Sequence, residues 1–209
     1  MVEKTKTGTT TLAIRCKDGV VLAADMRSTM GNVIARRVSE KISKITDSIA
    51  MTHAGVVSDI QLMEKLIKAE IKLKEIRNKR PVLVSEAANY VSGILYEMIR
   101  NPYAPSLAHF IMAGHDRSGS HIYDLMPDGV ITEIEDYEVS GSGGDFAVGI
   151  IDARYKKDMT VKEAKELAVE ALQNAMKRDS ASGDGIMIVI IDKNGVHESE
   201  KMKVVPTLK

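Results

Sequence analysis

The sequence GTTTLAIRCKDGVVLAAD, residues 8–25, predicts a β-hairpin. In its first strand, from Thr10 to Cys16, alternate residues share one face, which is the period of a strand. A turn at residues 17–19 leads into a second, largely apolar strand that ends at Asp25. The chain therefore begins with sheet structure, and the ends of its strands are candidate places for chemistry.

Thr9, which follows Gly8, is a candidate nucleophile. A threonine hydroxyl alone reacts poorly, whereas a free α-amine, with a pKa of about 7.7 to 8.0, accepts its proton near neutral pH. Cutting the bond between Gly8 and Thr9 would place both groups on one residue. Gly8 suits this position because a residue without Cβ adopts the strained backbone needed for attack on its carbonyl. The alternative is that residues 9–11 simply begin a strand, since threonine favours strands.

The composition indicates one globular domain and argues against several kinds of partner. The 209 residues are 44% hydrophobic and 28% charged, which is enough for one sizeable core. Lys and Arg together number 29, as do Asp and Glu, so no basic excess suggests nucleic acid. The single Cys16 excludes an internal disulfide, and His and Cys are too scattered for a recognisable metal site.

The start of the sequence lacks the features of a secretory signal. Residues 1–8 carry charges and no apolar stretch, and no later run is long enough to span a bilayer. We therefore expect a cytoplasmic protein that binds neither membranes nor nucleic acid.

The remaining periodicities predict paired strands that alternate with paired helices. Strands are expected at residues 41–45, 49–54, 108–115, 120–126, 130–139 and 186–191, the last with a short partner at 195–198. Helices are expected at residues 58–77, 85–100, 145–155 and 160–175. Capping boxes, Ser58 with Gln61 and Thr160 with Glu163, mark the first and last helices. This order fits antiparallel sheets with helices packed outside.

The sequence also contains six short motifs. In order, they are Gly8-Thr9-Thr10-Thr11, Leu22-Ala23-Ala24-Asp25, Glu40-Lys41-Ile42, Ala50-Met51-Thr52-His53-Ala54-Gly55, Gly141-Ser142-Gly143 and Arg178-Asp179-Ser180-Ala181-Ser182-Gly183. Together they resemble a β-type subunit of the 20S proteasome, most like the archaeal kind, and the resemblance covers essentially the whole chain. It implies the N-terminal nucleophile hydrolase fold, an α+β class of four layers (αββα). In this fold two antiparallel sheets are stacked face to face, with helices on both outer sides.

The resemblance implies a catalytic centre built on Thr9 as the nucleophile. Lys41 corresponds to the cation beside it, Asp25 to the carboxylate that holds Lys41, and Gly55 to the oxyanion donor through its backbone N–H. A lysine and an aspartate suit this chemistry. A nearby positive charge keeps the α-amine neutral, and a partly buried ammonium needs a carboxylate partner. Taken singly, Lys41 and Asp25 could form a surface ion pair, and Gly55 a turn.

Three further residues complete the implied catalytic set. Ser142, Asp179 and Ser182 correspond to groups that hydrogen-bond around the Thr9 amine. Each also has a local alternative, since residues 141–143 could form a flexible loop and residues 179–182 could simply end the last helix.

The resemblance further implies a pocket for the substrate side chain that precedes the scissile bond. Its lining would be Ser28, Thr29, Ser39, Ser43, His53, Val57 and Gln61. His53 stands where archaeal relatives commonly have an apolar residue. A neutral imidazole tolerates apolar and aromatic side chains, whereas a protonated one attracts acidic ones, so we expect a shift toward acidic residues below about pH 6.5. The alternative is that His53 is an ordinary wall residue.

The implied function is that of a threonine endopeptidase that degrades unfolded polypeptides inside a closed chamber. Residues 1–8 then form a propeptide, removed by autocleavage between Gly8 and Thr9, which leaves residues 9–209 as a single catalytic domain. Implied partners are α-type and other β subunits in four stacked seven-membered rings, with an unfolding ATPase docked on the outer rings. No metal or organic cofactor is needed. Two alternatives stay open: an amidohydrolase that acts on a small amide, and a structural ring subunit held as an uncut precursor.

Overall fold

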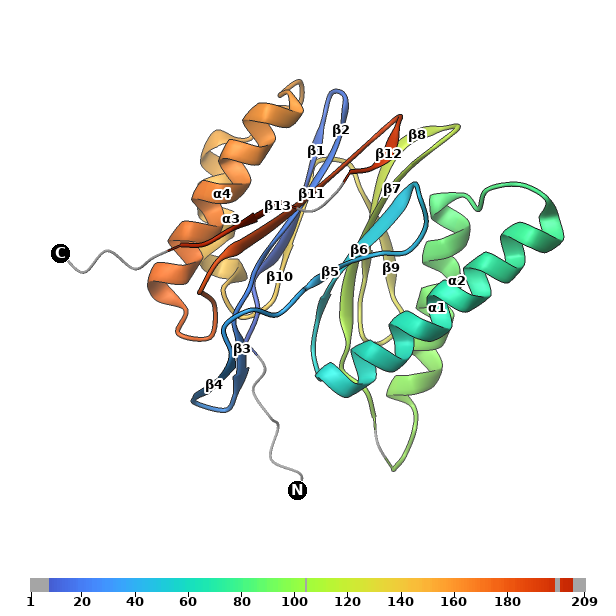
Figure 1. Ribbon diagram of the computed structural model, residues 1–209, viewed down its shortest axis with the longest axis horizontal. Coiled ribbons are helices and arrows are strands. Elements are labelled where there is room, and N and C mark those ends of the chain that lie inside the picture. Colours follow the sequence, from blue (N-terminus) through green and yellow to red (C-terminus); the bar gives the residue numbers. More distant parts are fainter. Residues whose placement is uncertain (1–7, 104, 198–199, 205–209) are drawn as a thin grey trace.

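The computed structural model, which describes residues 8–103, 105–197 and 200–204, has four layers (Figure 1). Two antiparallel sheets face each other in the middle, and a pair of helices covers the outer face of each. This arrangement confirms the predicted α+β sandwich.

The first sheet has the amino-terminal hairpin at its centre. Its strands, in spatial order, are β10 (Tyr137–Ser140), β1 (Thr11–Cys16), β2 (Gly19–Asp25), β11 (Ile186–Asp192) and β12 (Gly195–Val196), and β13 (Glu200–Met202) also pairs with β11. Leu12 packs toward the helices and Ala13 toward the other sheet, as the alternation of a strand requires. Strand β11 is likewise covered on both faces, by the helices at Ile188 and by the second sheet at Val189. The expectation for its unbroken apolar run is therefore confirmed.

The second sheet consists of β5 (Ile42–Lys44), β6 (Ile49–Ala54), β7 (His109–Asp116), β8 (Gly119–Leu125) and β9 (Ile131–Ile134), in that order. The single strand expected at residues 130–139 is wrong, because the chain passes there from one sheet to the other. Strand β9 pairs with β8, and β10 pairs with β1. The bend between them is held by a hydrogen bond from the Arg15 N–H to the Asp136 carbonyl, 2.7 Å long. This crossing brings Ser140 opposite Thr11.

A small hairpin that the periodicity did not predict follows β2. It pairs β3 (Ser28–Met30) with β4 (Val33–Arg36) around Gly31, whose φ of +59° lies in the left-handed region. Most of its residues are exposed, and it protrudes at the lower edge of the molecule in Figure 1.

The four helices are α1 (Val57–Asn78), α2 (Val84–Ile99), α3 (Gly144–Arg154) and α4 (Val161–Arg178). At the start of α4 the predicted capping box is confirmed, since the Glu163 N–H donates to Thr160 Oγ1 and Glu163 Oε2 accepts from the Thr160 N–H. The box expected from Ser58 and Gln61 is wrong. Helix α1 begins directly after the turn at Gly55, and the Ser58 hydroxyl donates to Asp59 instead.

Three apolar layers hold the sandwich together. One lies between the two sheets, one between the second sheet and helices α1 and α2, and one between the first sheet and helices α3 and α4. Helix α4 faces its sheet with Ala164, Leu167, Ala168, Ala171, Leu172 and Ala175. Small side chains allow this helix to pack closely on the sheet that carries the hairpin.

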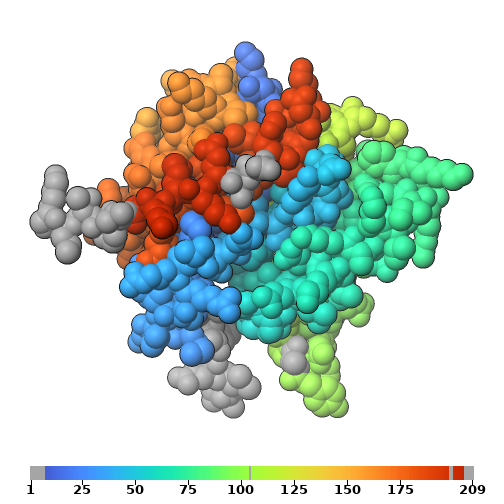
Figure 2. Space-filling view, in the orientation of Figure 1, coloured from blue at the N-terminus to red at the C-terminus, as the bar shows by residue number. Residues whose placement is uncertain are grey.

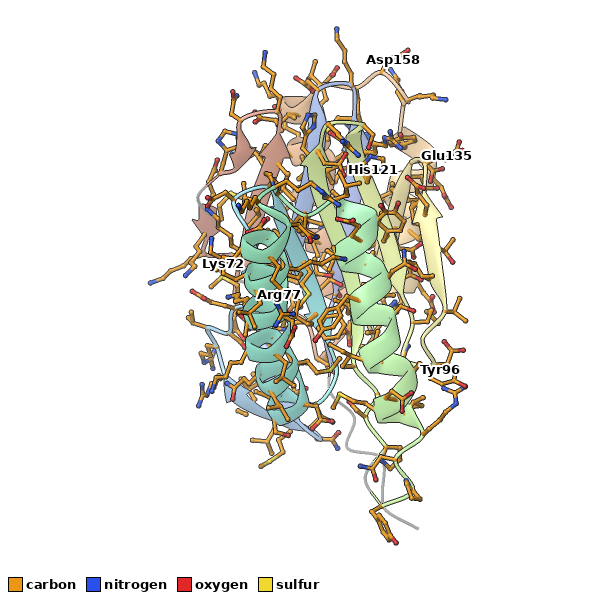
Figure 3. All side chains as sticks on the ribbon, turned by 90° about the vertical axis from the view of Figure 1, so that its right-hand side faces the viewer. Lys72, Arg77, Tyr96, His121, Glu135 and Asp158 are labelled. Carbon is orange, nitrogen blue, oxygen red and sulfur yellow. The ribbon has the colours of Figure 1, made fainter. Side chains whose placement is uncertain are left out.

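The outer face of α1 and α2 carries charged side chains together with exposed apolar ones, among them Leu62, Leu66, Leu73 and Ile76 of α1. Figure 3 looks onto these two helices, with Lys72 and Arg77 pointing outward from α1. On the face shown in Figure 2, the β5–β6 hairpin (light blue) lies between the C-terminal strands (red) and α1 (blue-green). A cleft of about 780 Å³ is lined there by residues 44–48 and 193–195 and by the C-terminal half of α1.

No helix among the described residues has the length and apolar character needed to cross a membrane.

Candidate active site

Thr9 lies just before β1 and is almost fully buried, with 6% of its surface exposed. The bond between Gly8 and Thr9 is intact here, so the Thr9 nitrogen is an amide, and it donates to Ser142 Oγ over 3.2 Å. The Thr9 hydroxyl donates to the Gly8 carbonyl oxygen over 2.7 Å. The hydroxyl is therefore placed beside the one peptide group whose cleavage would free its own amine.

Asp25 and Lys41 form a buried ion pair beside Thr9. Lys41 Nζ lies 2.7 Å from Asp25 Oδ1, and the two side chains are 5% and 0% exposed. Burial lowers the pKa of Lys41, and the carboxylates of Asp25 and Asp179 oppose this effect. The alternative of a surface ion pair is therefore wrong.

The Asp25 carboxylate is also fixed by three backbone N–H groups. Oδ1 accepts from Thr10 over 2.9 Å, and Oδ2 accepts from Arg27 and Gly183 over 2.9 and 3.0 Å. The end of β2, the start of β1 and the segment before β11 therefore meet on one side chain. Lys41 Nζ reaches past it to the Gly8 carbonyl oxygen, 3.4 Å away.

Asp179 holds the third part of the predicted set together. Its Oδ2 atom accepts from Ser142 Oγ over 2.6 Å and from Ser182 Oγ over 2.7 Å, and its Oδ1 accepts from the Ala181 N–H over 3.0 Å. Burial raises the pKa of Asp179, but these hydrogen bonds outweigh burial and hold its pKa below the usual value. Asp179 is also the C-cap of α4, as the helix-end alternative predicts, and its hydrogen bonds to Ser142 and Ser182 are compatible with the predicted site role.

The loop at residues 141–143 is packed against the candidate nucleophile. A Cβ atom on Gly141 would lie 2.0 Å from the Thr9 carbonyl oxygen, and one on Gly143 would lie 2.1 Å from Thr10 Oγ1. Gly141 also has a φ of +94°, which favours glycine. The glycines thus let this loop approach Thr9 closely.

Gly8 is enclosed just as tightly. A Cβ atom on Gly8 would lie 1.7 Å from Ala181 Cβ, and the Gly8 N–H donates to Thr29 Oγ1 over 3.2 Å. Thr29, one of the predicted pocket residues, therefore contacts the residue that precedes Thr9.

Gly55 contributes no side chain to this network and lies immediately after β6. Its φ is +136°, and a Cβ there would lie 3.0 Å from both the Leu107 carbonyl oxygen and Ala108 Cα. The backbone conformation and the close neighbour both require glycine at this position.

The other predicted pocket residues come from five places along the chain. Ser28 is on β3, Ser39 follows β4, Ser43 is on β5, His53 is on β6, and Val57 and Gln61 are on the first turns of α1. Neither the cleft described above nor a second one of about 240 Å³ between β5 and β11 includes any of them.

His53 lies in an environment that favours its neutral form. Burial lowers its pKa to about 4, Lys41 acts in the same direction, and the Glu64 carboxylate opposes them. A pKa of about 4 leaves the imidazole neutral at pH 6.5, which argues against a change of preference at that pH; the preference itself stays a prediction. Glu64, which also accepts a hydrogen bond from Ser43, was missed by the sequence reasoning. It lies one helical turn beyond Gln61, and this spacing could have indicated it.

Arg27 and Asp184 were also missed. Arg27 Nε donates to Asp184 Oδ2 over 2.7 Å, and Arg27 Nη1 donates to the Ser180 carbonyl over 2.8 Å. Arg27, two residues after Asp25, thereby connects the end of β2 with the loop that carries Asp179 and Ser182. No local pattern indicates this pair, because its two members are far apart in the sequence.

Comparison with known proteins identifies the family of the chain. A sequence model described as "Proteasome subunit" matches residues 5–191. Three archaeal proteins named "Proteasome subunit beta" are similar to the chain along most of their lengths. The protein of Ferroglobus placidus is 47% identical over 90% of this chain and 89% of its own. That of Archaeoglobus profundus is 45% identical over 97% and 93%, and that of Methanocella paludicola is 41% identical over 96% of each. The chain therefore belongs to the proteasome subunit family, among its β-type members.

Proposed function

We propose that this proteasome β-type chain is a threonine endopeptidase that is made as a precursor and activates itself between Gly8 and Thr9. Family membership supports a protease that assembles into proteasome complexes. The observation that carries the finer assignment is the placement of Thr9 Oγ1 at the Gly8 carbonyl, with the Lys41 ammonium 3.4 Å from the carbonyl oxygen.

In the activation step, Thr9 Oγ attacks the Gly8 carbonyl carbon while Lys41 stabilises the negative charge that develops on the oxygen. The Gly8 C–N bond breaks, the Thr9 nitrogen takes the proton lost by the hydroxyl, and an ester joins Gly8 to Thr9 Oγ. Water then hydrolyses the ester, which restores the hydroxyl and releases residues 1–8. The product, residues 9–209, begins with a free Thr9 amine.

In the peptidase reaction, the same hydroxyl attacks the scissile carbonyl of a substrate. The Thr9 amine accepts the hydroxyl proton and passes it to the leaving amine, and water then hydrolyses the acyl-enzyme. The Lys41 charge favours the neutral amine, and the Asp25 carboxylate holds Lys41 in place. Ser142, supported by Asp179, binds the Thr9 nitrogen. The Gly55 N–H stabilises the oxyanion, a contribution of about 3 kcal/mol.

The same proposal extends to the assembly. Active sites of this kind act on unfolded polypeptides inside a chamber of four stacked seven-membered rings, in which α-type subunits form the outer rings and β subunits the inner ones. An unfolding ATPase docks on the α rings, and the particle works in the cytoplasm. The chain supplies nucleophile, base and oxyanion donor by itself, so the reaction proposed here calls on no cofactor.

The direct test is the intact mass of the chain in assembled particles. We expect it to begin at Thr9, and we expect Thr9→Ala to keep residues 1–8 and to have no activity on peptides or casein. Thr9→Ser, which keeps a hydroxyl, serves as the control and should still be cleaved. Active particles that retain residues 1–8, or an active Thr9→Ala particle, would refute the proposal.

A further inference from the structure

A second polar chain crosses between the two sheets near the site, formed by Ser140, His109 and Asp124. Ser140 Oγ lies 2.6 Å from His109 Nδ1, and His109 Nε2 lies 2.6 Å from Asp124 Oδ1. Ser140 is at the end of β10 in the first sheet, whereas the other two lie on β7 and β8 in the second. Ser140 and Asp124 are buried, and the His109 side chain is 21% exposed.

Ser140 is continuous with the loop that holds Thr9. It pairs with Thr11 in the first sheet and directly precedes Gly141, against which the Thr9 carbonyl is packed. The next residue, Ser142, binds the Thr9 nitrogen. A displacement of Ser140 would therefore move the groups that position the nucleophile.

His109 is continuous with the backbone under Gly55. It pairs with Ala54 in the second sheet, and its neighbour Ala108 lies 3.0 Å from where a Gly55 Cβ would be. The hydrogen bond between Ser140 and His109 thus joins the loop packed against Thr9 to the strand packed against Gly55. The hydrophobic cluster between the sheets fixes distances less specifically than a directed hydrogen bond does.

We propose that His109 is a positioning residue, which sets the separation between Thr9 and the Gly55 N–H through its bond to Ser140. This inference rests on the proposed peptidase function. When His109 Nε2–H donates to Asp124, Nδ1 carries no hydrogen and can accept a hydrogen bond from the Ser140 hydroxyl. A displacement of about 1 Å between reacting groups costs on the order of 100-fold in rate, so the bond is expected to act on kcat.

Two substitutions of His109 separate its two bonds. Asn places a polar atom near the position of Nδ1 and keeps the bond to Ser140, whereas Gln reaches the position of Nε2 and keeps only the bond to Asp124. In assembled, cleaved particles we expect His109→Gln to lower kcat by about 10- to 100-fold with little change in KM, and His109→Asn to restore most of it. Ser140→Ala should match His109→Gln, and the double variant should lose no more than either alone.

A matched control lies on the same strand. His115 Nδ1 is 3.0 Å from Ser120 Oγ, an equivalent bond between β7 and β8 within the second sheet. His115→Gln should leave kcat unchanged. A peptidyl boronate, which becomes tetrahedral on a hydroxyl nucleophile, should bind His109→Gln less tightly, while the corresponding peptide amide should bind as before.

Several results would overturn the positioning role. These are equal kcat losses in His109→Asn and His109→Gln, a normal kcat in His109→Gln and Ser140→Ala, or a KM effect alone. Labelling of Ser140 by a fluorophosphonate in the Thr9→Ala particle would also overturn it, because Ser140 would then be a nucleophile itself. Failure of the peptidase proposal is distinguishable, since it would appear as activity in Thr9→Ala.

Discussion

Lys41 Nζ lies 2.7 Å from Asp25 Oδ1 and both side chains are buried, yet the two residues do not depend on each other equally. Asp25 has three backbone N–H donors besides Lys41, at Thr10, Arg27 and Gly183. Within the described part of the chain, Lys41 has the Gly8 carbonyl as its one hydrogen-bond acceptor besides Asp25. Without its ion-pair partner, the Asp25 carboxylate would therefore keep more hydrogen bonds than the Lys41 ammonium would.

We expect this asymmetry to appear in stability. Lys41→Met should give a folded, inactive chain that loses about 1–3 kcal/mol, because Asp25 keeps its backbone donors. Asp25→Asn should lose about 3–5 kcal/mol, since it leaves a buried ammonium and deprives N–H groups of their acceptor. Denaturant unfolding of the two variants measures the difference. A Lys41→Met chain that is less stable than Asp25→Asn would contradict it.

The contact between Gly8 and Ala181 predicts a suppressor. Gly8→Ala should block removal of residues 1–8, because its Cβ would lie 1.7 Å from Ala181 Cβ. Adding Ala181→Gly should partly restore cleavage, since the nearest remaining atom, the residue 181 Cα, is 2.9 Å away. Intact mass reports the outcome. Gly93→Ala is the control, because no atom lies within 4 Å of its Cβ position, and it should be cleaved normally.

His53 predicts a pH dependence of stability rather than of specificity above pH 5.5. Its pKa falls from 6.5 in the unfolded chain to about 4 in the folded one, so between these values only the unfolded chain binds the proton. Stability should fall as the pH drops from 6.5 to 4, by at most about 3 kcal/mol from this residue. His53→Gln should show a smaller decline in denaturant unfolding over that range. The ratio of acidic to apolar peptide cleavage should stay constant from pH 5.5 to 8, and a change near pH 6.5 would count against a neutral His53.

Asp184 binds two arginines that differ in exposure, and this difference gives a matched pair of variants. The Arg27 side chain is 18% exposed and also holds the Ser180 carbonyl, whereas the Arg37 side chain is 74% exposed. We expect Arg27→Gln to loosen the loop that carries Asp179, with lower activity and a loss of about 1–3 kcal/mol. Arg37→Gln should change stability by less than about 1 kcal/mol. Equal losses of stability for the two variants in thermal denaturation would show that the hydrogen bond from Arg27 to the Ser180 carbonyl does not stabilise the loop.

The sequence predicted those features whose causes are local. The hairpin at residues 8–25 follows from alternation and a turn, and the start of α4 follows from Thr160 and Glu163, which are three residues apart. The prediction was wrong at residues 130–139, where one alternating pattern covers two strands. Alternation does not show which sheet a strand joins. The β3–β4 hairpin was missed because its strands are short and lack a buried face.

For the site, the motifs and their resemblance to a family brought together residues that periodicity alone could not. Asp25 and Lys41 contact each other and the residues on either side of Thr9 across 15 to 33 positions of the chain, which no local rule encodes. The bonds of Arg27 to Asp184 and of His109 to Ser140 carried no motif at all. They arise only when segments that are distant in the sequence pack together, so the sequence alone does not indicate them.

The crossing of β9 into β10 and the pairing of two sheets place the halves of the site on different layers. Thr9 precedes β1 and Asp25 ends β2 in the first sheet, whereas Lys41 and Gly55 flank strands of the second. In the proposed mechanism, a chain that has formed either sheet alone has the Thr9 hydroxyl without Lys41 and without the Gly55 N–H. The proposed activity would then require the completed sandwich, and a newly made or partly folded chain would not yet cleave proteins.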